Sequence, residues 1–173
     1  MEFIESGSEL TRWAARLAVA GWVAWLLLAV GRCSSHLRRW AWTAGLTAHL
    51  AHVLCAFHFV HHWSHSEAVR HTARLTERVV GWDWGGGVWV NYTFTLAWLI
   101  DAAWWWCRPA TELRSGMWSW LVNGFFAFLF FNATVVFGPW GWKPVGAVVL
   151  VATAVLASWR HRSALRDPLE ESQ

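Results

Sequence analysis

The chain has 173 residues and a formal net charge of +3, and 56% of its residues are apolar whereas only 14% are charged. Soluble domains carry about 25% charged residues, so this composition argues against an ordinary water-soluble domain. The apolar residues form blocks close to the roughly 20 residues that a helix needs to cross a bilayer. We therefore predict an all-α polytopic transmembrane helical bundle, with one transmembrane domain over 1–160 and a polar tail over 161–173.

The charged residues and the cysteines exclude several kinds of site. Lys143 is the single lysine, and the arginines are scattered between the apolar blocks, which favours contact with membrane lipids and leaves no basic tract for nucleic acid. The three cysteines, Cys33, Cys55 and Cys107, form no CxxC pair. This pattern favours neither a disulfide framework nor a thiolate metal site.

The apolar blocks predict five spans in chain order. They cover about 13–30, 40–62, 87–106, 117–138 and 144–159. The segment before the first span, "MEFIESGSELTR", is acidic, whereas a signal peptide begins with basic residues, so we expect a retained span. The glycine-rich stretch "WDWGGGVW" is expected to form the turn that leads into the third span, while Gly124 and Gly146 are candidates for close helix approaches.

A further helix is predicted over 66–80, between the second and third spans. Apolar residues recur there at helical spacing with arginines between them, which is typical of an amphipathic helix at the membrane interface. Ser64 or Ser66 is the expected N-cap, and Gly81 the expected end. Alternatively, this helix and the second span form one long bent helix.

The loop charges give an orientation. With the N-terminus outside, eight arginines face the cytoplasm and six basic residues face the exterior, of which three belong to the interfacial helix. This asymmetry favours an N-out, C-in orientation, and the composition favours a bacterial cytoplasmic membrane. Most of the 18 tryptophans, Trp42 and Trp105 among them, fall near predicted span ends and are expected to anchor the chain at the interfaces.

Histidines are concentrated in the second span, which ends in "HFVHHWSH" over 58–65. On a helical wheel His49 and His52 share one side, whereas the other histidines of this segment lie on the opposite side. Because His49 and His58 are about 13 Å apart along the axis, one metal ion cannot reach both groups. The candidate metal ligands are His49, His52, His58, His61, His62 and His65.

Other polar residues lie inside the predicted third and fourth spans. Such residues are costly in lipid unless they pair, so we expect them to face each other in a polar seam within the bundle. The residues of this predicted seam are Asn91, Tyr92, Asp101, Asn123 and Asn132.

The segment "HFVHH" resembles one histidine box of membrane-bound di-iron hydroxylases and desaturases. That family has three such boxes, and here the second and third are missing, so the resemblance covers five residues and the family is not adopted.

Three functions remain open at the level of sequence. The first is binding of haem or a transition metal through histidines of the second span, with a haem requiring a mixed axial pair or a homodimer. The second is a non-catalytic membrane scaffold, or an accessory subunit of a partner membrane protein, whose buried polar residues join helices. The third is a small proton-coupled carrier that uses Asp101 with His49 and His52, and its size would require a dimer.

Overall fold

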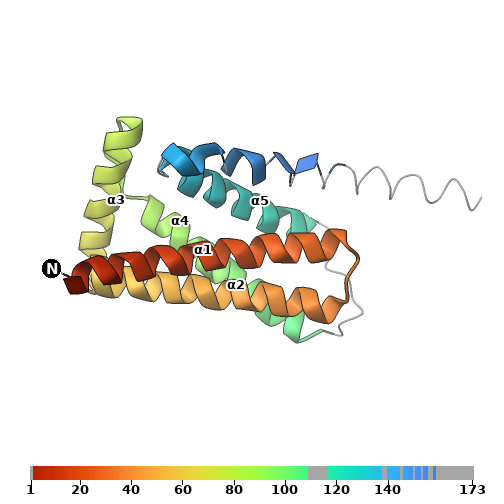
Figure 1. The fold of residues 1–173 in the computed structure, drawn as a ribbon. Coiled ribbons are helices and arrows are strands. Elements are labelled where there is room, and N and C mark those ends of the chain that lie inside the picture. The colour runs from red at the N-terminus through yellow and green to blue at the C-terminus, as the bar shows by residue number, and fades with distance from the viewer. Residues whose placement is uncertain are drawn as a thin grey trace, which may run out of the picture.

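A computed structural model describes residues 2–108, 117–137, 140–144, 146–149, 151–152, 154–155 and 158. All regular elements in these ranges are helical (Figure 1). The α-helices are α1 (Glu2–Val30), α2 (Ser35–Cys55), α3 (His65–Val80), α4 (Gly87–Trp106) and α5 (Met117–Phe131). The π-helix η1 (Ala56–Val60) continues α2, the π-helix η2 (Asn132–Val136) continues α5, and the 3-10 helix η3 is Trp140–Trp142.

Four helices form the bundle, and α3 runs across it. Figure 1 shows α1 and α2 side by side as a long hairpin, with α4 and α5 lying against this pair. The helix α3 projects across the direction of α1 and α2, at the end of the bundle where the N-terminus lies. Its position places the amphipathic segment at one end of the bundle instead of within it.

Three helices in the described part of the chain are long and apolar enough to cross a membrane: Gly7–Val30, Ser35–Val60 and Met117–Val136. The prediction of an all-helical membrane protein is confirmed in this form, but five spans are not. The helix α4 has the length, with 20 residues, but it is not among these three. The fifth predicted span, 144–159, is described only in part, and its described residues are helical; the tail 161–173 lies outside the described residues.

A turn separates α2 from α3, so the alternative of one long bent helix is wrong. His62 and Trp63 have positive φ angles of 49° and 59°, and α3 leaves this turn across the direction of α2 (Figure 1). The Ser64 hydroxyl accepts a hydrogen bond from the Glu67 backbone N–H at 3.2 Å, which makes Ser64 the N-cap of α3. Gly81, with φ of 78°, ends the helix in the left-handed conformation, as predicted.

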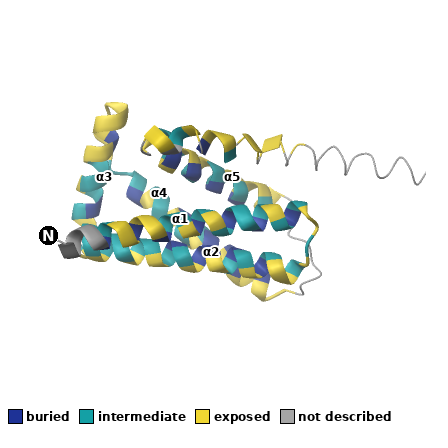
Figure 2. Ribbon diagram, viewed as in Figure 1, coloured by how far each residue is buried: buried dark blue, intermediate teal, exposed yellow. Residues whose placement is uncertain are grey.

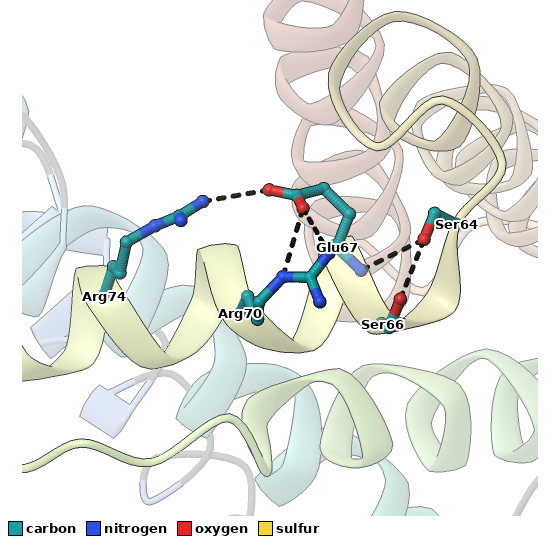
Figure 3. Close-up of polar contacts among 5 residues, drawn as sticks. All are labelled: Ser64, Ser66, Glu67, Arg70 and Arg74. Atoms are coloured by element: carbon teal, nitrogen blue, oxygen red, sulfur yellow. Dashed lines mark hydrogen bonds and ion pairs between the residues drawn. The ribbon is translucent and has the colours of Figure 1, made fainter.

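The first turns of α3 carry a charged cluster. The Glu67 carboxylate accepts hydrogen bonds from Arg70 at 2.7 Å and from Arg74 at 3.0 Å (Figure 3). These hydrogen bonds hold the pKa of Glu67 below its ordinary value, and the nearby arginine charges act in the same direction. The cluster joins residues of one helix, and it orders the exposed face of α3.

The core of the bundle is aromatic. Trp42 is fully buried, and Trp22 and Trp98 are 1% exposed. The Trp42 ring lies 5.1 Å from that of Trp25, 5.3 Å from that of Trp98 and 4.9 Å from that of Phe126. We call these five residues, Trp22, Trp25, Trp42, Trp98 and Phe126, the aromatic core; buried positions run along the inward faces of the helices (Figure 2).

Two tryptophans expected at the interfaces belong to the interior. Trp42 is fully buried, and Trp105 is 6% exposed. By contrast Trp40, two residues from Trp42, is 61% exposed, as expected of an interfacial anchor. Two residues along a helix turn the side chain by about 200°, so proximity to a span end did not determine which indole faces inward.

Glycines let α1 and α2 approach closely. A methyl group on Gly21 would lie 2.5 Å from the Cα atom of Gly45, a separation that the two backbones could not maintain. Small residues at such crossings are typical of membrane helix pairs. Of the two glycines singled out in the sequence, Gly146 does lie at a close approach, against Thr134, whereas Gly124 has open space around it.

Candidate functional site

His49 lies in the interior of the bundle and joins α2 to α4. Its side chain is 6% exposed, and its Nε2 lies 2.9 Å from the Thr95 hydroxyl. That hydroxyl donates its only hydrogen to the Asn91 carbonyl at 2.8 Å, so it must accept from His49. The proton of neutral His49 therefore resides on Nε2, which leaves the lone pair on Nδ1.

His52 lies one turn further along α2 and joins α2 to α1. Its Nδ1 lies 2.9 Å from the backbone carbonyl of Thr11. A carbonyl can only accept, so Nδ1 is the protonated nitrogen and Nε2 keeps the lone pair. Both inner histidines thus use their N–H group to bind a neighbouring helix, and each retains one nitrogen that can accept a hydrogen bond or bind a cation.

These two histidines border one cavity of about 180 Å³. It lies between α1, α2, α4 and α5 with η2, and three of its lining residues are polar: His49, His52 and Asn91. The rest of the wall is apolar, formed by Ala15, Ala18, Val19, Trp22, Phe94, Trp98, Phe126, Leu129, Phe130 and Ala133. The His49 and His52 rings are 6.3 Å apart, and the Trp98 ring stacks on His49 at 5.5 Å with 29° between the planes.

The outer histidines lie around the turn between η1 and α3, and they do not meet the inner pair. His58 is exposed, and its Nδ1 accepts a hydrogen bond from the Trp63 indole at 3.2 Å. His65, at the start of α3, lies 3.0 Å from the Tyr92 hydroxyl of α4. His62 is exposed in the turn itself.

His61 is the partly buried member of this outer group. Its ring lies 5.4 Å from that of His71, a residue of α3 that the sequence did not single out. Burial lowers the pKa of His61 below its ordinary 6.5; His71 lowers it further and His62 does so weakly, whereas Glu67 acts in the opposite direction. These effects together favour the neutral form of His61.

The six candidate ligands are not assembled into a metal centre in the described part of the chain. No group of three or more histidine, cysteine or acidic side chains there is close enough to hold one ion. The inner pair shares a cavity, and the outer four are distributed around the turn. A protein zinc site takes four ligands, or three and a water, so two imidazoles alone form an incomplete set.

The predicted seam residues are spread along the bundle, and four of the five have separate side-chain partners. Asp101, 2% exposed, accepts a hydrogen bond from the Trp118 indole of α5 at 2.8 Å. Asn123 lies 3.4 Å from the Trp22 indole N–H of α1 and donates to the Ser119 carbonyl. Asn132 donates to the Phe128 carbonyl of its own helix, Tyr92 contacts His65, and Asn91 borders the cavity.

The partners of the inner histidines, Thr11 and Thr95, were missed in the sequence. Threonine within a helix commonly bonds the carbonyl four residues before it, and both residues do so here. Because the Thr95 hydroxyl donates its hydrogen to the Asn91 carbonyl, its oxygen is available as an acceptor. To predict the pair of His49 and Thr95, sequence analysis would have needed to know that this threonine of α4 faces this histidine of α2.

Neither a family model, nor a curated protein, nor a solved structure matches this chain. The functional argument therefore rests on the geometry of the described residues.

Proposed function

We propose that this protein is a multi-pass integral membrane scaffold or accessory subunit, in which buried polar side chains join helices and no reaction is catalysed. The proposal depends on one observation: side-chain hydrogen bonds connect the four bundle helices in a closed ring. In the membrane such bonds replace the water that polar groups have elsewhere.

The ring contains four hydrogen bonds between neighbouring helices. His52 to the Thr11 carbonyl joins α2 to α1, and His49 to Thr95 joins α2 to α4. The Trp118 indole to Asp101 joins α5 to α4, and the Trp22 indole to Asn123 joins α1 to α5. His65 with Tyr92 adds α3 to the same assembly. Four of the predicted polar residues thus serve helix packing in the ring, and two more do so at its edge: His49, His52, Asp101 and Asn123, then His65 and Tyr92.

Binding of haem or a transition metal has less support. The inner pair supplies two imidazoles, fewer than the three or four protein ligands that a zinc site takes, and no third ligand joins them among the described residues. A cavity of about 180 Å³ is smaller than the roughly 300 Å³ at which sites for drug-sized ligands begin, and a haem macrocycle exceeds that size. A proton-coupled carrier has less support too, since Asp101 bonds Trp118 and does not line the cavity of His49 and His52.

The proposed topology has five spans and an N-out, C-in orientation in a bacterial cytoplasmic membrane. The helix α4 counts as a span because it bonds α2 through Thr95 and α5 through Asp101, and Trp98 on its inward face is 1% exposed. Tyr92, Thr95 and Asp101 of α4 each have a hydrogen-bond partner, which lowers the cost of placing these side chains in lipid. In this arrangement α3 lies at the membrane interface with Arg70 and Arg74 near lipid headgroups, and the partners are lipids and another membrane subunit or a second copy.

The decisive experiment measures colour and metal content of the detergent-purified protein together with its unfolding temperature. We expect no Soret band and no stoichiometric iron, copper or zinc, and a lower unfolding temperature when His49 is replaced by Phe. The matched control is His58→Phe, which changes an exposed histidine outside the ring and should leave the unfolding temperature nearly unchanged. Stoichiometric metal or haem that is lost in His49→Phe and kept in His58→Phe would overturn the proposal. Proton-driven uptake of solute into reconstituted vesicles would overturn it in favour of a carrier.

A further inference from the structure

The cavity between the four bundle helices has the features of a small ligand site. We propose that it binds a neutral six-membered aromatic ring that carries a hydroxyl group, a phenol or quinol, taken from the lipid phase. This inference goes beyond the proposed scaffold function, because a helix bundle needs no ligand to hold together.

The size of the cavity selects one ring. An engineered cavity of about 150 Å³ in another protein holds a single benzene molecule, so about 180 Å³ accommodates one six-membered ring with small substituents. Aromatic side chains line much of it, including Trp22, Phe94 and Trp98. Such walls favour a planar aromatic ligand through offset stacking and edge contacts.

The polar atoms select a ligand that donates a hydrogen bond. As derived above, the lone pairs lie on His49 Nδ1 and His52 Nε2, because the opposite nitrogen of each ring donates to a neighbouring helix. No hydrogen bond to either of these two acceptor nitrogens is present among the described residues. An acceptor without a partner is costly in lipid, and a hydroxyl group in the cavity would satisfy it.

The charge and location of the cavity select a neutral ligand from the membrane. None of its thirteen lining residues is acidic, lysine or arginine. Its walls include residues of the three helices that are long and apolar enough to cross a membrane, and Ala133 on its border is exposed. A lipid-soluble ring therefore has a path from the bilayer into the cavity.

Two matched probes test the assignment: 4-methylphenol, which donates a hydrogen bond, and 4-methylanisole, which has the same ring but can only accept. Binding is measured by equilibrium dialysis against the protein in nanodiscs, with empty nanodiscs of the same lipid subtracted. We expect saturable binding of one phenol per chain, with an affinity about 2- to 10-fold higher than that of the anisole. Absence of saturable binding, or equal affinity for the two probes, would overturn the proposal.

Cavity size is tested with a matched pair of substitutions on α1. Ala15→Leu fills the cavity and should reduce phenol affinity by about tenfold or more, since interiors tolerate added volume poorly. Ala20→Leu makes the same change on the exposed face of α1 and should leave phenol binding unchanged. Equal phenol binding by the two variants would place the ligand elsewhere and overturn the assignment.

The acceptor nitrogens are tested with amide replacements that keep the helix contacts. His49→Gln places an amide N–H near the former Nε2, and His52→Asn places one near the former Nδ1, so each variant keeps its donor and moves its acceptor, now an amide oxygen, away from the position of the imidazole lone pair. Each should lower phenol affinity about 2- to 10-fold and leave anisole affinity unchanged. Equal losses for both probes would contradict the role of these nitrogens. Stoichiometric zinc displaced by neither phenol nor anisole would also overturn the proposal, in favour of a metal held by the same two atoms.

Discussion

Trp42 of the aromatic core and His58 of the histidine turn, which we define as residues 58–65, lie on the same long segment of α2 and η1 but differ in almost every physical respect. Trp42, in the first half of α2, is fully buried and has three aromatic rings within 5.3 Å. His58, in η1, is exposed and bonds the exposed Trp63 five residues away. One region is fixed by contacts between helices, and the other largely by contacts within one turn.

The comparison shows that an unusual residue type does not by itself locate function. The histidine turn has the more conspicuous sequence. Its four histidines, however, lie at different places around the turn and form no metal-binding group among the described residues. His49 and His52 stand at the edge of the aromatic core, and there each imidazole acquires a defined tautomer and a common cavity. In this bundle, hydrogen bonds to a neighbouring helix determine which nitrogen of His49 and of His52 carries the proton.

The largest effect is expected in the aromatic core. Trp42→Ala removes a fully buried indole and should destabilise the protein by about 3–5 kcal/mol. Trp40→Ala removes an indole of the same helix that is 61% exposed, and should cost about 1 kcal/mol or less. Thermal unfolding in detergent measures both variants. Equal losses would show that the core is not what holds the helices together.

The next effect is expected at the crossing of α1 and α2. Gly21→Ala places a methyl group against the backbone of Gly45 and should destabilise the bundle by about 1–3 kcal/mol, because neither backbone can move aside cheaply. The matched control is Gly124→Ala, where open space surrounds the added methyl group and a small gain in stability is expected. Unfolding temperatures of the two variants should shift in opposite directions; a shared direction would contradict the close approach.

The sequence predicted the helical membrane fold, the cap at Ser64 and the end of α3 at Gly81, because length, hydropathy and capping chemistry are local properties. It could not distinguish Trp40 from Trp42, since both lie near a predicted span end and only helix rotation separates them. It named His49 and Asp101 but not their partners Thr95 and Trp118. Those pairs depend on how distant segments pack, which no local pattern contains.

A smaller effect is expected for the hydrogen bond between His49 and Thr95. Thr95→Val keeps the shape of the side chain and removes the hydroxyl, and a double-mutant cycle with His49→Leu should give a coupling of about 0.6 kcal/mol, with about 1.7 as the upper end. Thr93→Val is the matched control, because Thr93 is exposed and bonds only the Trp89 carbonyl of its own helix. A coupling energy indistinguishable from that of the Thr93 control would show that the hydrogen bond between His49 and Thr95 does not help to hold α2 and α4 together.

The smallest effect is expected at the histidine turn and depends on pH. The pKa of His61 in the folded protein is lowered from 6.5, first by burial and then by His71. The unfolded chain therefore binds this proton more readily, so stability is complete above pH 6.5 and is lost as pH falls through the folded pKa. An NMR titration of His61 should give a pKa below 6.5, and His71→Gln should move it upward by removing the second cause. A downward shift, or none, would show that His71 does not affect the titration of His61, although the two rings lie 5.4 Å apart.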